Sequence, residues 1–120
     1  MPFKFEKLEV WQKVIELADL IYDASRNFPD YEKFGLANQM RRAAVSISSN
    51  IAEGSSRESK NDFARFLQIA YGSVMEVVSQ AEIAHRQNLL SVQNRNQLKQ
   101  NAEELSRMLS GLRSKLLSGP

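Results

Sequence analysis

Apolar residues recur at alternating spacings of three and four through the second half of the chain, and this spacing constrains the fold more than any other feature. The first such run consists of Phe63, Leu67, Ala70, Val74, Val77, Ala81 and Ala84. The second run consists of Leu98, Ala102, Leu105, Leu109, Leu112 and Leu116. Residues spaced in this way share one side of an α-helix, and helices with this repeat pack at about 20° in left-handed bundles. The pattern therefore predicts two long helices, over residues 60–87 and 91–117, packed against each other.

The first half of the chain carries two shorter periodic segments. Residues 6–26 predict a helix whose apolar positions are Leu8, Trp11, Ile15, Ala18 and Tyr22. A second apolar stripe widens that face and consists of Val10, Val14, Leu17, Ile21 and Ala24. Residues 35–53 predict a helix whose core stripe is Leu36, Met40, Ala43, Ile47 and Ile51. Each segment is amphipathic, so each is expected to pack one side against the rest of the fold.

Turn and cap residues separate these segments. Pro29 ends the first segment because the residue before a proline avoids helical geometry, and Gly54 is predicted to end the second in a left-handed conformation. Ser59 and Ser91 are predicted N-caps of the third and fourth helices. No segment alternates with the period of a β-strand. The sequence therefore predicts one all-α domain over residues 1–120, an antiparallel up-down four-helix bundle.

The composition excludes several classes of protein. The chain has no cysteine, which excludes a disulfide scaffold and a thiolate zinc site. No apolar run approaches the roughly 20 residues of a membrane span. The N-terminal residues 1–4 lack the apolar core of a signal peptide. We therefore expect a cytoplasmic protein that has no membrane partner.

The single histidine offers little for catalysis. His85 ends the sequence Glu82-Ile83-Ala84-His85, but a di-iron bundle needs two Glu-x-x-His motifs and two further inward glutamates. We expect Glu82 to pair with Arg86 instead, with an intersubunit metal site as the alternative. No Gly-rich oxyanion loop lies near His85, so a Ser-His-Asp triad is not expected. The chain is predicted to be no enzyme, with no catalytic residue, metal or cofactor.

A polar stripe runs beside the apolar stripe of the second helix. Its members are Gln39, Arg42, Ser46, Ser49 and Glu53. A partner stripe on the third helix consists of Ser73, Glu76 and Gln80. One interpretation is a solvated face, and a second is a structural network between the helices in which Arg42 pairs with Glu76 and which includes Asn50 and Glu53. A direct role in binding a ligand or nucleic acid is the third.

Basic residues concentrate where the second helix is followed by the third. Residues 41–65 hold five basic and three acidic side chains, whereas the whole chain has a formal charge of only +2. The cluster is either ordinary surface charge or a phosphate-binding patch. The candidate nucleic-acid contacts are Arg41, Arg57, Lys60 and Arg65. The nearby Phe63, Phe66 and Tyr71 are expected in the core, and not as platforms for base stacking.

Four segments of the sequence carry a family resemblance: FEKLEVWQKVIELADLIYDASRNFP (5–29), FGLANQMRRAAVSISSNIAEGSSR (34–57), FARFLQIAYGSVMEV (63–77) and RMLSGLRSKL (107–116). The resemblance is to a bacterial family, the four-helix bundle proteins encoded in intervening sequences of 23S ribosomal RNA genes. Its most specific part is the pair Arg41-Arg42 with residues 50–54, Asn-Ile-Ala-Glu-Gly. The resemblance implies a bundle that assembles into a ring, often a pentamer, with no established enzyme activity. The sequence is also similar to the more basic accessory protein of diversity-generating retroelements, which works with a reverse transcriptase and nucleic acid.

Three functional hypotheses remain open, of which the third is an enzyme or a small-ligand binder. In the first, the chain is a homo-oligomer, pentameric by resemblance, that binds structured RNA or a nucleoprotein partner. In the alternative, it is a scaffold for protein–protein interaction with no nucleic-acid role. Both include self-association, since residues 6–26 carry two apolar stripes and residues 35–53 are rich in small side chains. A single bundle covers only part of that surface.

Overall fold

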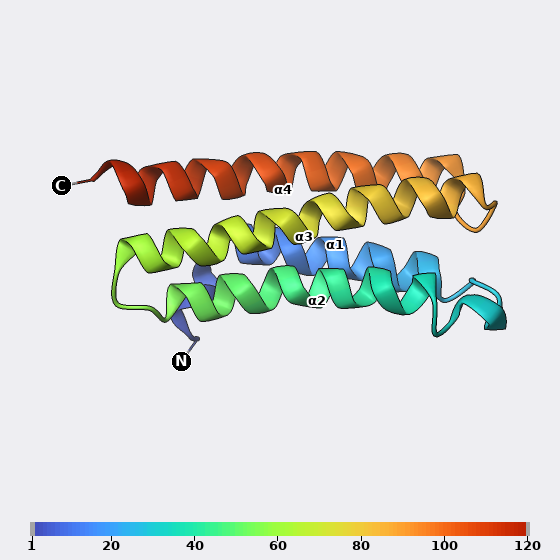
Figure 1. Cartoon of the computed structure of the whole chain (residues 1–120), viewed down its shortest axis with the longest axis horizontal. Helices are drawn as coiled ribbons and strands as arrows, with labels where there is room; N and C mark the ends of the chain where they lie inside the picture. Colours follow the sequence, from blue (N-terminus) through green and yellow to red (C-terminus); the bar gives the residue numbers. More distant parts are fainter. Residues whose placement is uncertain (1, 120) are drawn as a thin grey trace.

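The computed structural model describes residues 2–119 and consists of helices and their connections (Figure 1). The four long helices are α1 (Glu9–Ser25), α2 (Leu36–Ser55), α3 (Lys60–Arg86) and α4 (Val92–Ser118). Two 3₁₀ turns, η1 (Lys4–Lys7) and η2 (Asp30–Glu32), precede α1 and α2. Pro120, in the expected C-terminal tail, lies outside the described residues. The predicted all-α, up-down bundle is confirmed.

Each helix packs against its neighbours in sequence, and α4 closes the bundle against α1. The bundle measures 50 × 26 × 20 Å, and α3 and α4 of 27 residues each run along its long axis. Figure 1 shows both termini and the α2–α3 connection at one end of the bundle, which we call the terminal end. The α1–α2 and α3–α4 connections lie at the opposite end.

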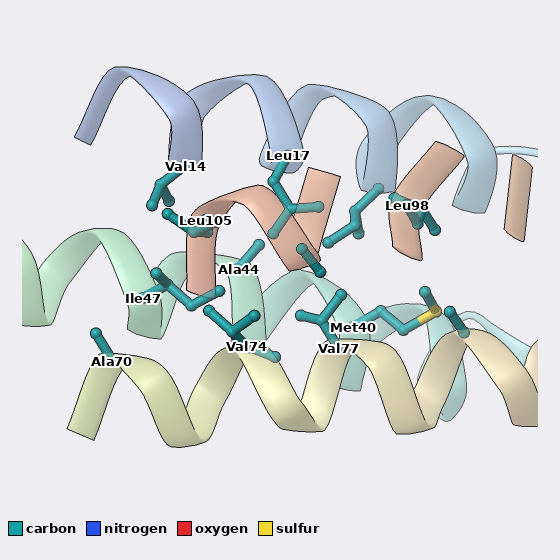
Figure 2. Close-up of a cluster of buried hydrophobic side chains, with 14 of the residues drawn as sticks. Val14, Leu17, Met40, Ala44, Ile47, Ala70, Val74, Val77, Leu98 and Leu105 are labelled. Carbon is teal, nitrogen blue, oxygen red and sulfur yellow. The ribbon is translucent and has the colours of Figure 1, made fainter. Parts of the chain in front are cut away.

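The core is a column of apolar side chains from all four helices (Figure 2). The stripes predicted on α2 and α3 are buried except for Leu36, which is partly buried. On α4 the stripe is buried as far as Leu109, whereas Leu112 and Leu116 are only partly buried. Figure 1 shows the reason, because the last turns of α4 project beyond the α2–α3 connection.

Helix α1 faces the core with a different stripe from the one predicted as its main apolar side. Four residues at most 4% exposed form its core stripe: Val10, Val14, Leu17 and Ile21. The other stripe lies at the edge of the bundle, where Ile15 is 37% exposed and Trp11 is partly buried. The helix also begins at Glu9 and not at Glu6, because Leu8 is extended and residues 4–7 form η1. Both stripes are apolar, so hydrophobicity alone did not distinguish them.

Both predicted N-caps are confirmed. The Ser59 hydroxyl accepts a hydrogen bond from the backbone N–H of Asp62 at 3.0 Å, and the Ser91 hydroxyl accepts one from Asn94 at 3.0 Å. Each cap satisfies one of the N–H groups that the first helical turn leaves without a partner. The caps begin α3 and α4 next to short connections, which makes consecutive helices antiparallel.

The predicted left-handed conformation of Gly54 is wrong. No glycine in residues 2–119 has a positive φ, and α2 continues through Gly54 to Ser55. Glycine is required there for space: a Cβ on Gly54 would lie 2.6 Å from Cβ of Phe66 and 3.0 Å from a ring carbon of Phe63. Helices α2 and α3 therefore approach each other closely at this point. The left-handed residue in the described chain is Asn88, with φ 61°, in the α3–α4 connection.

Replacing Gly54 with alanine is expected to lower the free energy of unfolding by about 1–3 kcal/mol, because Cβ of Phe66 cannot move without shifting α3. The matched control is Gly72→Ala in α3, where an added Cβ meets no atom within 4 Å. That change is expected to stabilise the helix by about 0.5–1 kcal/mol. Urea unfolding of both variants measures the two changes in the free energy of unfolding, which are expected to have opposite signs. Equal stabilisation by both changes would show that the helices do not approach closely at Gly54.

Replacing Leu109 with alanine is expected to cost about 2–5 kcal/mol of stability, since the side chain is 1% exposed and its removal leaves a cavity. Leu117→Ala, on the same helix but 45% exposed, is the control and should change stability by less than about 0.5 kcal/mol. Chemical denaturation of the two variants is the measurement. Similar losses in both would mean that the buried side of α4 has been assigned wrongly.

Candidate nucleic-acid interface

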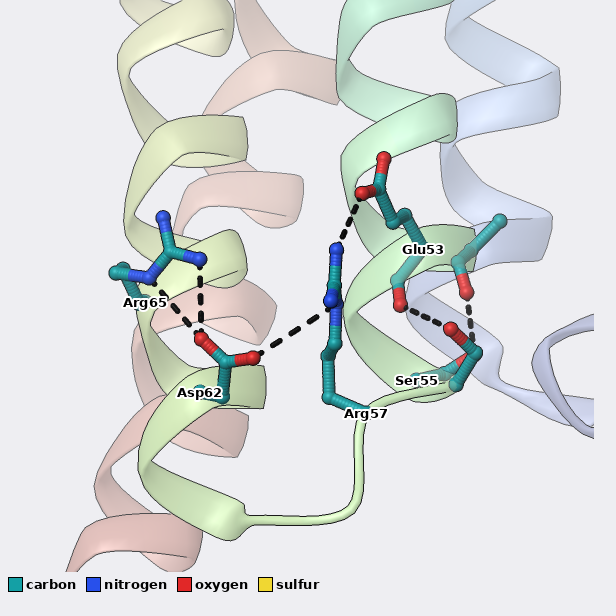
Figure 3. Close-up of polar contacts among 7 residues, drawn as sticks. Glu53, Ser55, Arg57, Asp62 and Arg65 are labelled. Carbon is teal, nitrogen blue, oxygen red and sulfur yellow. Dashed lines mark hydrogen bonds and ion pairs between the residues drawn. The ribbon is translucent and has the colours of Figure 1, made fainter.

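Carboxylates pair with two of the predicted nucleic-acid contacts at the α2–α3 connection (Figure 3). Arg57 donates to Glu53 at 2.6 Å and its Nε lies 3.7 Å from Asp62. Arg65 donates to Asp62 through two nitrogens, at 3.0 and 3.1 Å. Asp62 also lies in the first turn of α3, where the helix dipole favours a negative charge. The charges of both arginines are therefore largely balanced within the chain.

The same two arginines cover an aromatic ring. The guanidinium carbons of Arg57 and Arg65 lie 4.8 and 4.7 Å from the centre of the Phe66 ring. These are cation–π contacts, in which the ring face attracts a positive charge. Phe66 is 7% exposed and Phe63 is 8% exposed, so the expectation that both are core residues is confirmed. Neither ring offers an open face to a nucleic-acid base.

Lys60 has a different environment. It is exposed and forms no ion pair with another side chain in residues 2–119. Its Nζ lies close to Gly119 at the end of α4, 3.3 Å from where a Cβ of that glycine would be. The carbonyl end of a helix attracts a cation. Within residues 2–119 the ammonium group of Lys60 nevertheless has no carboxylate partner that competes with a phosphate.

Arg41 does not belong to this cluster. Its Nε donates to the Ser25 hydroxyl at 2.9 Å, and its guanidinium lies 4.8 Å from the ring centre of Tyr22. Both partners are at the C-terminal end of α1. Arg41 precedes the end of α2 by almost four turns, roughly 20 Å at 1.5 Å per residue. The predicted patch is thus corrected to Arg57, Lys60 and Arg65, and Arg41 joins α1 to α2.

The polar stripes of α2 and α3 meet through serines and an asparagine. The hydroxyls of Ser46 and Ser73 are 3.1 Å apart, and the Asn50 amide donates to the Ser46 carbonyl at 2.8 Å. Arg42 and Glu76 are both exposed and form no ion pair with any residue in the described part of the chain. This corrects the interpretation in which Arg42 pairs with Glu76 in a network between the helices. A single exposed pair gains too little from Coulomb attraction to hold two long side chains together.

The comparison with known proteins rests on the whole bundle. Residues 6–111 match the family described as the 23S rRNA-intervening sequence protein. The chain belongs to this family. A crystal structure of a protein with unknown function from the S23 ribosomal protein family of Bacteroides thetaiotaomicron VPI-5482 is similar, with a TM-score of 0.79 at 24% identity. The similarity covers 87% of this chain and 97% of that one and concerns the fold. No protein among the curated ones matches the chain.

In this member of the 23S rRNA-intervening sequence family, residues of the most specific resembling segments, Arg41-Arg42 and 50–54, make contacts that stabilise the bundle. Arg41 contacts Ser25 and Tyr22, Asn50 bonds back to Ser46, and Gly54 allows the close contact with Phe66. Glu53 of the same segment pairs with Arg57. These contacts explain why those residue types stand at those positions without assigning them a ligand.

The Glu82–Arg86 pair predicted from the i, i+4 spacing is confirmed, at 3.2 Å. Arg95 also binds Glu82 at 3.1 Å and joins α4 to α3. Hydrogen bonding from Arg86, together with that from Arg95, lowers the pKa of Glu82. Nδ1 of His85 lies 3.0 Å from the carbonyl oxygen of Leu90.

Two features are absent from the described part of the chain. Within residues 2–119, no three His, Cys, Asp or Glu side chains gather where they could hold a metal ion. In the same range, no helix combines the length and the apolar character that crossing a bilayer requires.

A further ion pair between helices, Lys13–Glu104, joins α1 to α4 and was not predicted. The hydrogen bond between the two raises the pKa of Lys13 and lowers the pKa of Glu104. Lys13 and Glu104 are far apart in sequence, so only the closure of α4 against α1 brings them together. Nothing in the local sequence signalled this pair.

Proposed function

We propose that the chain works as a non-enzymatic, homo-oligomeric helical bundle, with five copies as the number that the family resemblance implies. The observation that carries this proposal is one face of the bundle, the α2–α3 face, formed by Arg42, Ser49, Ile69, Glu76 and Ile83. Ile69 and Ile83 are 43% and 50% exposed, and Glu76 stands between them at heptad spacing. A second copy of the chain is the partner that suits this face.

The charges of the α2–α3 face favour a second copy of the chain as its partner, in preference to a polyanion such as RNA. The contact of Gly54 with Phe66 and the bond between Ser46 and Ser73 set the antiparallel register, which brings Arg42 level with Glu76. The face thus presents one positive and one negative charge between exposed isoleucines. Oε1 of Gln80, on the same side of α3, is buried without a hydrogen-bond partner. Opposite charges beside apolar residues favour a protein surface with the same arrangement.

Self-association is tested by placing a charge on the α2–α3 face. The double variant Ile69→Glu/Ile83→Glu is expected to run as a monomer of about 13.7 kDa, while the parent runs at a multiple of that mass. A buried, unpaired carboxylate opposes association because it loses its hydration. Val92→Glu, at a residue 43% exposed in the first turn of α4, is the control and should keep the parent's mass. Light scattering at micromolar concentration is the measurement, and a monomeric parent would contradict the proposal.

A second candidate function is binding of structured RNA or a nucleoprotein at the terminal end. The supporting observation is a group of lysines there, Lys4, Lys7, Lys60 and Lys115, which form no ion pair within residues 2–119. Free ammonium groups bind phosphates and release counterions. Arg57 and Arg65 contribute less, because binding has to compete with Glu53 and Asp62. In a ring, every subunit presents the same lysines.

The RNA candidate is tested with Lys60→Glu. The variant is expected to bind structured RNA more weakly, with a log–log salt slope smaller by about 0.7–0.9 for each phosphate that it no longer binds. Lys33→Glu makes the same change of charge at the opposite end, where Lys33 pairs with Asp30, and should bind like the parent. Fluorescence anisotropy over a range of salt concentrations gives both quantities. If no RNA binds at low salt, or if Lys60→Glu binds like the parent, the scaffold without a nucleic-acid role is the function that stands.

A further inference from the structure

A polar pocket lies between α3 and α4, on a different side of the bundle from the α2–α3 face. Its volume is about 310 Å³. Gln68 and Tyr71 line it from α3, and Ser110, Arg113 and Ser114 line it from α4, beside the buried Leu109. Residues 110 and 114 are four positions apart, and residues 110 and 113 are three apart, so all three side chains leave α4 on one side.

Arg113 is the unusual member of this pocket. It is half-buried, and its Nε is covered by protein atoms without a hydrogen-bond partner. The other two half-buried arginines among residues 2–119 both have partners, because Arg95 binds Glu82 and Arg41 binds Ser25. No Asp or Glu lines the pocket, and Arg113 forms no ion pair with the described residues. A partly desolvated charge without a counter-ion favours an anion from outside the chain.

Three hydroxyl groups of the pocket are also free to donate hydrogen bonds. The hydroxyls of Tyr71, Ser110 and Ser114 make no hydrogen bond to other described residues, whereas the neighbouring Ser106 and Ser118 bond back to backbone carbonyls. A guanidinium beside several hydroxyls matches the oxygens of a phosphate group, each of which accepts a hydrogen bond. No carboxylate among the described residues that line the pocket opposes the positive charge of Arg113. The volume accommodates a phosphate group together with part of the ester that carries it.

We propose that the α3–α4 pocket is a phosphate-binding site in which Arg113 is the principal ligand and Ser110, Ser114 and Tyr71 complete the set of donors. The phosphate belongs either to a small phosphate ester or to an RNA backbone, and the chemistry of recognition is the same. The site lies within one bundle, so it does not depend on self-association.

Binding is measured by NMR, titrating the ¹⁵N-labelled full chain with inorganic phosphate against chloride at constant ionic strength. Saturable shifts are expected at the amides of residues 110–114 and at Nε of Arg113. Arg113→Gln should weaken binding by roughly tenfold or more, as for the loss of a hydrogen bond to a charged group. Lys99→Gln removes an equal charge from an exposed position on the same helix, far from the pocket and outside the lysine group of the terminal end, and should bind phosphate like the parent.

A second variant keeps the charge and removes the hydroxyls. Ser110→Ala/Ser114→Ala is expected to weaken phosphate binding while Arg113 stays in place, and alanine at these exposed helical positions preserves folding. The proposal is overturned if phosphate causes no saturable shift in the parent. It is also overturned if Arg113→Gln and Lys99→Gln respond to phosphate alike, since the shifts would then report charge screening.

Two further titrations identify the source of the phosphate. If a structured RNA shifts the same resonances and excess phosphate displaces it, the pocket takes a backbone phosphodiester. If adenosine monophosphate shifts them and RNA does not, the pocket takes a small phosphate ester. Both outcomes support the pocket once inorganic phosphate has caused saturable shifts in the parent, and they differ only in the source of the phosphate. Light scattering on the same samples reports self-association separately, so failure of the pocket and failure of the oligomer are distinguishable.

Discussion

The close approach of α2 and α3 at Gly54 and Phe66 determines much of the surface of this bundle. Because glycine leaves room for the Phe66 side chain, the end of α2 lies directly against the first turns of α3. Arg57 then reaches the Phe66 ring and Asp62 from the connection, and Arg65 reaches the same two groups from α3. The same approach sets the level at which Ser46 meets Ser73. The absence of a Cβ at position 54 therefore determines the geometry of both the α2–α3 connection and the α2–α3 face.

The fold could be read from the sequence because its determinants are local. Heptad spacing, serine caps and Pro29 act over one or two turns, so they predicted the helices and their antiparallel order. Local sequence does not determine which of the two stripes of α1 faces the core. It depends on where α2 and α4 lie around α1, and both stripes are hydrophobic enough to face them. Gly54 illustrates the same limit, because glycine serves a left-handed turn or a close contact equally well.

The candidate site was harder to predict because charge does not specify a partner. The i, i+4 spacing correctly gave Glu82 with Arg86, since that pair lies on one helix. Arg41 was grouped with Arg57 by nearness in sequence, but almost four helical turns, roughly 20 Å, separate Arg41 from the end of α2. Arg42 and Glu76 lie level on adjacent helices, and yet solvent competes successfully for both charges. The α3–α4 pocket joins residues about 40 positions apart in the sequence, which no local pattern reveals.

The common position of the two termini has a consequence for how the molecule is handled. An affinity tag or fluorescent protein joined at the C-terminus emerges close to Lys60, and one joined at the N-terminus emerges at the same end of the bundle. Either one shields the basic surface that an RNA experiment is meant to probe. The turn at residues 30–34 lies at the far end, where Tyr31 and Phe34 are 79% and 92% exposed. A probe or surface attachment made there leaves the lysines and the Arg113 pocket open to their partners.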